Sequence, residues 1–249
     1  MLQIPSGKLV RFRLTILAVV MALVSGCTAT VPETARVQHA ELPDYKVGNH
    51  RVEEAIDLYI EPRIQDLRLT VTPQSETKVY NPIPVLVGPS LERALLAMSR
   101  QHFANITTVE EPDDNPTLSY KLLTYKPVVS VVPGFITKRL NVSARLALQV
   151  SIHAANGEQL FSTTAIGTSH VSDTKLAAGS GLKDGPRLLE VATRDAIIDA
   201  MYDISSIFGN SSSEISDGVR VSSTSPNAAV ETMDDVILHL RTWREEADN

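Results

Sequence analysis

The stretch that decides the fold is Val142-Ser-Ala-Arg-Leu-Ala-Leu-Gln-Val-Ser-Ile-His153, in which apolar and mostly polar residues alternate. Alternation with a period of two predicts a strand with one face in a core and the other in water. The pair Asn156-Gly157 follows, and it accepts the positive φ angles of a tight hairpin turn. Residues 160–169 are therefore predicted to return as the antiparallel partner strand.

Further strands and two helices are predicted around this hairpin. Short apolar alternations predict strands near residues 56–60, 106–109 and 118–125. One helix is predicted to begin at Gly88-Pro89-Ser90 and to end near His102, because Pro suits a first helical turn. A second is predicted from Asp184-Gly185-Pro186 to Gly209-Asn210, residues that tolerate the left-handed conformation beyond a helix end.

This order of elements predicts an α+β fold, an antiparallel sheet with two helices packed on it. The expected organisation is a signal peptide at 1–26, a lipidated tether at 27–50, an α+β domain at 51–208, a Ser-rich flexible linker at 209–226 and a C-terminal helix at 227–247. Two alternatives stay open for that last helix, since its narrow apolar stripe suits packing on its own domain or insertion into a partner's groove.

Composition narrows the class of protein. The 249 residues are 43% hydrophobic and 21% charged, with a formal net charge of −6, which excludes collagenous and wholly disordered chains. One cysteine excludes a disulfide framework and a Cys-rich metal site. The acidic balance argues against a nucleic-acid partner, because such surfaces need clustered Lys and Arg.

The amino-terminal segment has the pattern of a secretory signal. Lys8, Arg11 and Arg13 precede an apolar run at 14–24, and small residues follow it. A run of 11 residues is shorter than the roughly 20 that span a hydrocarbon core, so a permanent transmembrane helix is the weaker interpretation.

Val24-Ser25-Gly26-Cys27 resembles the lipobox of bacterial lipoproteins, and it holds the one cysteine of the chain. The resemblance implies cleavage before Cys27, diacylation of its thiol and acylation of the new amino end, typically with palmitate. Thr28, being other than Asp, implies sorting to the periplasmic face of the outer membrane. Removal of residues 1–26 takes away three basic residues and no acidic one, so the remainder carries a formal charge of −9.

A weaker resemblance concerns the body, roughly residues 83–208. The segment Gly88-Pro-Ser-Leu-Glu-Arg-Ala-Leu-Leu96 before Phe103-Ala-Asn-Ile106, and the Asn-Gly hairpin with Phe161, are similar to YajG-like lipoproteins and to assembly lipoproteins related to CsgG and the amino-terminal domain of TolB. This architectural likeness implies a role in envelope assembly. It supplies no catalytic motif.

Catalytic and metal-binding patterns are weak throughout the sequence. Gly179-Ser180-Gly181 lacks the Gly-x-Ser-x-Gly spacing of a nucleophile elbow, and no phosphate-binding glycine motif is present. His153 and His170 could face one another on the hairpin, but a third ligand is not evident. The acidic run at 110–114 is typical of a solvated loop. We therefore expect no enzyme activity, no catalytic residue, no cofactor and no metal.

One apolar segment is bracketed by residues that disfavour a central strand, namely Lys126-Pro-Val-Val-Ser-Val-Val-Pro-Gly-Phe-Ile-Thr-Lys138. It suits either an apolar loop or edge hairpin that docks a partner or touches lipid, or an ordinary edge strand folded over the core. The candidate partner-binding residues are Val128, Val129, Val131, Val132, Phe135 and Ile136.

Together these patterns predict a non-enzymatic outer-membrane lipoprotein that acts as an accessory, assembly or scaffold subunit of an envelope complex. The membrane is the first expected partner, through the lipid on Cys27, with an envelope protein as the second and a homo-oligomer as a further possibility. The alternative is a small-ligand or lipid-binding auxiliary component of a transport system, with a pocket between sheet and helices.

Overall fold

The structure is a computed structural model that describes residues 34–37, 51–76, 79–176, 182 and 184–224. The signal peptide, the lipobox with Cys27, most of the tether, Gly179-Ser180-Gly181 and the helix expected at 227–247 lie outside these residues. No helix of the described part is both long and apolar enough to cross a membrane.

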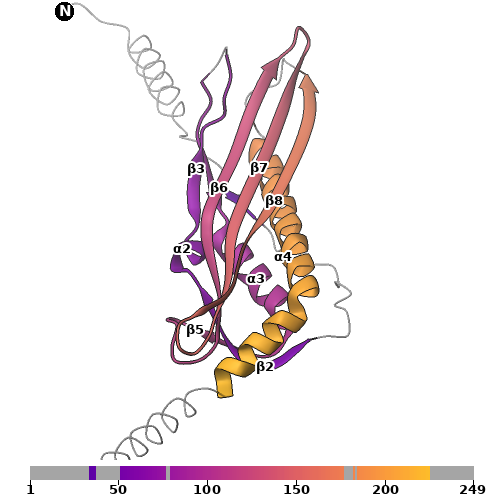
Figure 1. Ribbon diagram of the computed structural model, residues 1–249. Coiled ribbons are helices and arrows are strands. Elements are labelled where there is room, and N and C mark those ends of the chain that lie inside the picture. Colours follow the sequence, from indigo (N-terminus) through magenta and orange to yellow (C-terminus); the bar gives the residue numbers. More distant parts are fainter. Residues whose placement is uncertain (1–33, 38–50, 77–78, 177–181, 183, 225–249) are drawn as a thin grey trace, which may run out of the picture. The chain divides into compact units, whose positions relative to one another are not determined.

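A five-stranded sheet forms the centre of the body (Figure 1). Its order is β5 (Phe103–Val109), β2 (Val52–Ile60), β6 (Thr117–Pro133), β7 (Thr137–His153) and β8 (Gln159–Leu176). The strands β6, β7 and β8 are antiparallel neighbours, and Gly157 takes φ +80° in the turn between the last two, as the sequence predicts.

The expectation of a wholly antiparallel sheet is wrong at β2, which runs parallel to both β5 and β6. The connection from β2 to β5 contains two helices and crosses over the sheet, and a crossover brings the next strand back in the same direction. The sheet is therefore mixed.

A second, smaller sheet consists of β1 (Ala35–Arg36), β4 (Ile83–Leu86) and β3 (Arg68–Val71), and the short helix α2 (Pro62–Gln65) precedes β3. Strand β1 lies inside the segment expected to be a tether. Ala35 and Val37 are buried there, and the Ser90 hydroxyl donates a 2.6 Å hydrogen bond to the Val37 carbonyl. The folded body therefore begins at residue 35 and not near residue 51.

Helix α3 (Gly88–His102) begins and ends as the sequence predicts, and α4 (Gly185–Thr224) begins at the predicted Gly185-Pro186. The predicted stop of α4 at Gly209-Asn210 is wrong, and so is the part of the predicted 209–226 linker that the structure describes, because the helix continues to Thr224. Gly209 does not take a positive φ, and Ile215 and Val219 bury their side chains beyond it. Burial of these apolar groups outweighs the weak helix propensity of Gly and Ser.

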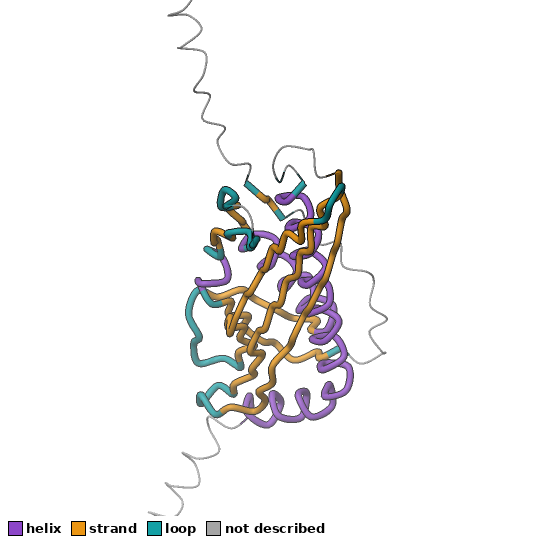
Figure 2. The backbone as a smooth tube through the Cα atoms, turned by 90° about the horizontal axis from the view of Figure 1, so that it is seen from above, coloured by secondary structure: helices purple, strands orange, loops and turns teal. Residues whose placement is uncertain are grey.

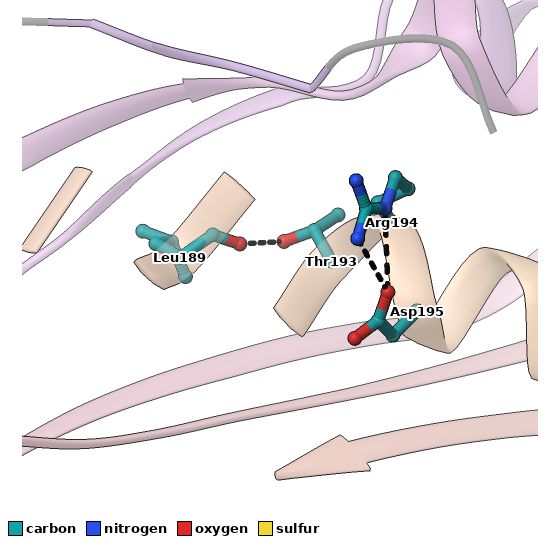
Figure 3. Close-up of polar contacts among 4 residues, drawn as sticks. All are labelled: Leu189, Thr193, Arg194 and Asp195. Carbon is teal, nitrogen blue, oxygen red and sulfur yellow. Dashed lines mark hydrogen bonds and ion pairs between the residues drawn. The ribbon is translucent and has the colours of Figure 1, made fainter. Parts of the chain in front are cut away.

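Both helices contact the same face of the sheet, which we call the inner face. Ser99 on α3 donates to its own helix at the Leu95 carbonyl, so its hydroxyl accepts from Tyr120 of β6 at 2.9 Å. Thr193 on α4 repeats this arrangement. It donates to the Leu189 carbonyl at 2.7 Å (Figure 3), and it accepts from Tyr125 at 2.6 Å. These two chains of hydroxyl hydrogen bonds, which we call hydroxyl relays, thus connect β6 to both helices.

Helix α4 runs alongside β8 (Figures 1 and 2) and protects the open edge of that strand. The carboxylate of Asp203 accepts the backbone N–H of Ile166 at 2.9 Å, and that of Asp199 accepts the N–H of Thr168 at 2.8 Å. Edge N–H groups that already have acceptors cannot template a foreign strand.

The close approach of α4 to the sheet depends on Gly167 of β8. A Cβ atom at this position would lie 1.9 Å from the Ala196 carbonyl oxygen and 2.5 Å from the Ala200 backbone nitrogen. Ala192, Ala196 and Ala200 present small side chains to the sheet on the same side of α4. A larger residue at position 167 must therefore push the helix away.

We expect Gly167→Ala to lower the free energy of unfolding by about 2–3 kcal/mol, because overpacking forces the backbone to shift. Gly209→Ala is the matched control, since that position has open space and lies within a helix. It should raise stability by about 0.5–1 kcal/mol. Denaturant unfolding followed by circular dichroism measures both, and a loss of stability in Gly209→Ala would contradict a helix that continues past residue 209.

Candidate functional site

The apolar segment bracketed by prolines forms the far half of the β6–β7 hairpin. Pro133 pairs with Lys138, and the Gly134 N–H donates to the Thr137 carbonyl at 2.7 Å to close the loop. Gln74 bonds to the open side of β6 here, through N–H to the Val129 carbonyl at 2.8 Å and through its own carbonyl to the Val131 N–H at 2.9 Å.

The prolines are compatible with this strand because of where their nitrogens point. The Val131 N–H is directed away from β7, and every second residue before and after it along the strand shares that orientation. Pro127 and Pro133 occupy such positions, opposite Ala144 and Lys138 of β7. Neither proline removes a hydrogen bond from the β6–β7 ladder. At these two positions the open edge of β6 has no N–H donor.

The six predicted partner-binding residues divide into two groups. Val129 and Val131 are 0% and 4% exposed and belong to the core, and Val128 is half-buried. Val132, Phe135 and Ile136 are 48%, 101% and 65% exposed. Val129 and Val131 pack in the core, as the alternative of a strand folded over the core expects. Docking stays a prediction for the last three residues, which we call the hairpin tip.

A groove lies beside the hairpin tip. Gln74, Ser75 and Glu76 form one side and residues 130–133 of β6 the other, and the enclosed volume is about 500 Å³. The sequence gives no signal for this side of the groove, because the bridge between Gln74 and Ser130 joins residues far apart in the chain. A partner that contacts the tip can also reach the polar groups of the groove.

A second cavity of about 410 Å³ lies at the opposite end of β6 and β7. Its lining includes Tyr59, Asp113, Ser119, Lys121 and His153. The Ser119 hydroxyl bonds to that of Ser151 at 2.8 Å, so both buried hydroxyls are satisfied. This cavity is open to solvent beside the acidic loop and is not the pocket between sheet and helices that the ligand-binding alternative expects.

The hypothesis that His153 and His170 face one another is wrong. His170 lies opposite Ser143, ten residues along β7 from His153, which corresponds to roughly 33 Å. Within the described ranges, no group of three or more His, Cys, Asp or Glu side chains could hold a metal ion.

His102 is a buried histidine that the sequence does not distinguish from the other five. It lies 3% exposed between the two helices, with Nε2 3.0 Å from the Ser205 hydroxyl and its ring 5.3 Å from that of Phe208. Burial, and secondly the positive charge of Arg51, lower the pKa of His102 from 6.5 to about 4. The imidazole is therefore neutral at physiological pH.

Comparison with known proteins gives only distant likenesses. No protein-family model matches the chain, and no curated protein matches it. A minor lipoprotein from Acinetobacter baumannii is 13% identical with a TM-score of 0.34, over 62% of this chain and 90% of its own. A DUF330 protein from Xanthomonas campestris is 11% identical with a TM-score of 0.41, over 77% and 100%.

A third solved structure, a neuraminyllactose-binding hemagglutinin homologue from Helicobacter pylori, is 9% identical with a TM-score of 0.35, over 74% of this chain and 97% of that one. At these identities and TM-scores the family of the chain stays open. The proposals below therefore rest on the residues of this chain.

Val131→Asp and Val132→Asp should behave differently although the two residues are adjacent. The first places a charge in the core and should cost about 3 kcal/mol or more of unfolding free energy. The second lies in water and should change stability by less than about 0.5 kcal/mol. Thermal unfolding of both variants is the measurement, and equal losses would mean that the tip is part of the core.

Stability should fall as the pH drops from about 6.5 to 4, because the unfolded chain then binds a proton at His102 that the folded protein excludes. The full effect is about 3 kcal/mol, and it is absent above pH 7. Urea unfolding of the wild type and of His102→Gln across this range isolates the contribution. Parallel pH curves for the two proteins would contradict the buried neutral imidazole.

Proposed function

We propose that the protein is a lipid-anchored accessory or scaffold protein on the periplasmic face of the bacterial outer membrane, and that it docks an envelope partner through the hairpin tip. The observation that carries the proposal is the exposure of Val132, Phe135 and Ile136 at the end of a long hairpin. Apolar side chains that gather on a surface are typical of an interaction site.

The hairpin is suited to this role because its base is rigid. The relays from Tyr120 and Tyr125 fasten β6 to both helices, and Gln74 braces the strand four residues before the loop begins. A surface that is already ordered loses little conformational entropy when a partner binds. The tip can therefore contribute affinity with few contacts.

The anchor is the predicted lipid on Cys27. Seven residues, 28–34, separate Cys27 from Ala35, where the folded body begins, and the eight Cα–Cα steps between the two reach at most about 28 Å. The body would thus stay close to the membrane, because this linking segment is shorter than the tether at 27–50 that the sequence predicts. Confinement of this kind raises the effective concentration of a partner in the same membrane.

The alternative, a small-ligand or lipid-binding auxiliary protein of a transport system, would have to use the cavity around Tyr59, Lys121 and His153 in place of a pocket between sheet and helices. Native mass spectrometry of the detergent-extracted protein distinguishes the two functions. A bound small molecule that Lys121→Ala releases would support the alternative. The scaffold function needs no such ligand and no catalytic group.

Metabolic labelling and in-cell photocrosslinking test the proposal together. The wild type should incorporate labelled palmitate, fractionate with the outer membrane, and give a protein adduct from benzoylphenylalanine at position 135. Cys27→Ser should lose the label and the membrane fraction and yield much less adduct. Thr28→Asp is the matched control, because it should keep the label and move the protein to the inner membrane.

Two results would overturn the proposal. A Cys27→Ser protein that fractionates like the wild type would remove the lipid anchor. A lipidated wild type that gives no protein adduct from position 135 would remove the docking function of the tip.

A further inference from the structure

We infer that the solvent-facing side of β6, β7 and β8 binds an acidic segment of the partner protein. The inference rests on the proposed function, because it names the chemistry of the partner that the hairpin tip docks. We call this surface the outer face. It consists of the residues that alternate with the inner-face residues along the upper part of the three strands.

Four permanent cations lie on the outer face, and all four side chains are exposed: Lys121 and Lys126 on β6, and Arg139 and Arg145 on β7. Their register spreads them along the strands, because Lys121 is opposite Gln149, ten residues along β7 from Arg139, which corresponds to roughly 33 Å. Lys126 is directly opposite Arg145, and Arg139 is directly opposite Val132 of the hairpin tip. The tip and the basic surface are therefore continuous.

The charges are not neutralised within the face. Its remaining positions between 121 and 132, 139 and 149, and 162 and 174 are Ser, Thr, Asn, Gln, Val, Ala, Ile and His, with no Asp or Glu, and Leu123 is exposed at the register shift of β6. Among the described residues, no hydrogen bond or ion pair is found for the side chains of Lys121, Lys126, Arg139 and Arg145. The carboxylates of Asp199 and Asp203 come from α4 and accept backbone N–H groups at the β8 edge.

This arrangement works against folding stability. Like charges directly opposite one another on neighbouring strands repel and destabilise the sheet. Lys121 lines a cavity together with Asp113 of the acidic loop, so the surface nearer the hairpin tip holds three of the cations, Lys126, Arg139 and Arg145. The chain as a whole has more acidic than basic residues, so strands that present three cations and no acid on this surface depart from its average composition. Solubility alone does not require such a separation of charge, whereas a complementary partner does.

The dimensions of the outer face suit a protein partner. Three strands at a spacing of about 4.8 Å over some twelve residues give an area on the order of 600 Å². A stable interface buries about 800 Å² per partner, and the adjoining tip and groove supply further area. Hydroxyl and amide groups between the cations can donate hydrogen bonds to carboxylates of the partner.

An acidic protein fits these observations better than an anionic bilayer. The mature chain carries a formal charge of −9, so an extended anionic surface that spans the whole body is repelled by the rest of it. A protein segment that contacts the outer face alone avoids this repulsion, because salt screens charges beyond about 8–10 Å. The occupant is thus an acidic segment of a different envelope protein.

In-cell photocrosslinking of the full chain from benzoylphenylalanine at Ser143 tests the inference. Ser143 lies in the middle strand, opposite Val128 and His170. The expected adduct is a protein whose crosslinked segment has more Asp and Glu than Lys and Arg. The double variant Lys126→Glu/Arg139→Glu should reduce the adduct at least tenfold without lowering the Tm, since a Glu at position 126 faces Arg145.

Arg68→Glu/Arg93→Glu is the matched control. It makes the same change of net charge at two exposed positions on β3 and α3 and should leave the adduct unchanged. Replacement of the acidic residues of the crosslinked segment by Lys should restore the adduct with Lys126→Glu/Arg139→Glu. This exchange of charges separates direct contact from a general effect of charge.

The inference would be overturned if Lys126→Glu/Arg139→Glu did not weaken the adduct, or if Arg68→Glu/Arg93→Glu weakened it equally. A crosslink from position 143 to lipid or to a second copy of this chain would also overturn it, as would the absence of any adduct from Ser143. If position 135 still gives a protein adduct in that last case, the proposed function survives and the basic docking surface alone fails. If neither position gives an adduct, both proposals fail.

Discussion

The contact between Gly167 of β8 and the backbone of α4 at Ala196 is the constraint on which the rest of the body depends. With no side chain at this point, the helix lies directly on the strand and buries its row of alanines. The same placement brings Asp199 and Asp203 to the β8 edge and Thr193 to Tyr125. It also encloses His102 between the two helices, where its pKa falls because water is excluded.

From this constraint follows the division of the sheet into two faces. The inner face is apolar and is joined to the helices by two hydroxyl relays, and β6 and β7 stay paired over 17 residues each with one register shift, between Leu122 and Thr124. The outer face has no comparable burial requirement on its upper part, and its residues are free to serve binding. A single alternating pattern thus provides both the core of the protein and a surface of defined charge.

The hairpin tip, the groove beside Gln74 and the basic outer face adjoin one another on one strand pair. Apolar contact at Phe135 and Ile136 and charge complementarity at Arg139 and Lys126 would act on the same partner. The short covalent link between Cys27 and Ala35 would confine that partner's search to the membrane surface. The affinity for the partner would then come from the tip and the outer face, and the confinement to the membrane would come from the lipid on Cys27. These separate origins suit an accessory protein.

The sequence by itself determined the elements that depend on neighbouring residues: the alternation of β7, the Asn156-Gly157 turn, and the starts of the helices at residues 88 and 185. Only the tertiary structure decided what depends on distant residues. It made β2 parallel to β6, paired Gln74 with Ser130, joined Ala35 to Val85, and continued α4 past Gly209 by burying Ile215 and Val219. It also separated Val131 from Val132, and His153 from His170. The physical reason is that periodicity records which face of an element is apolar, whereas pairing and burial depend on side chains that the chain brings together only when it folds.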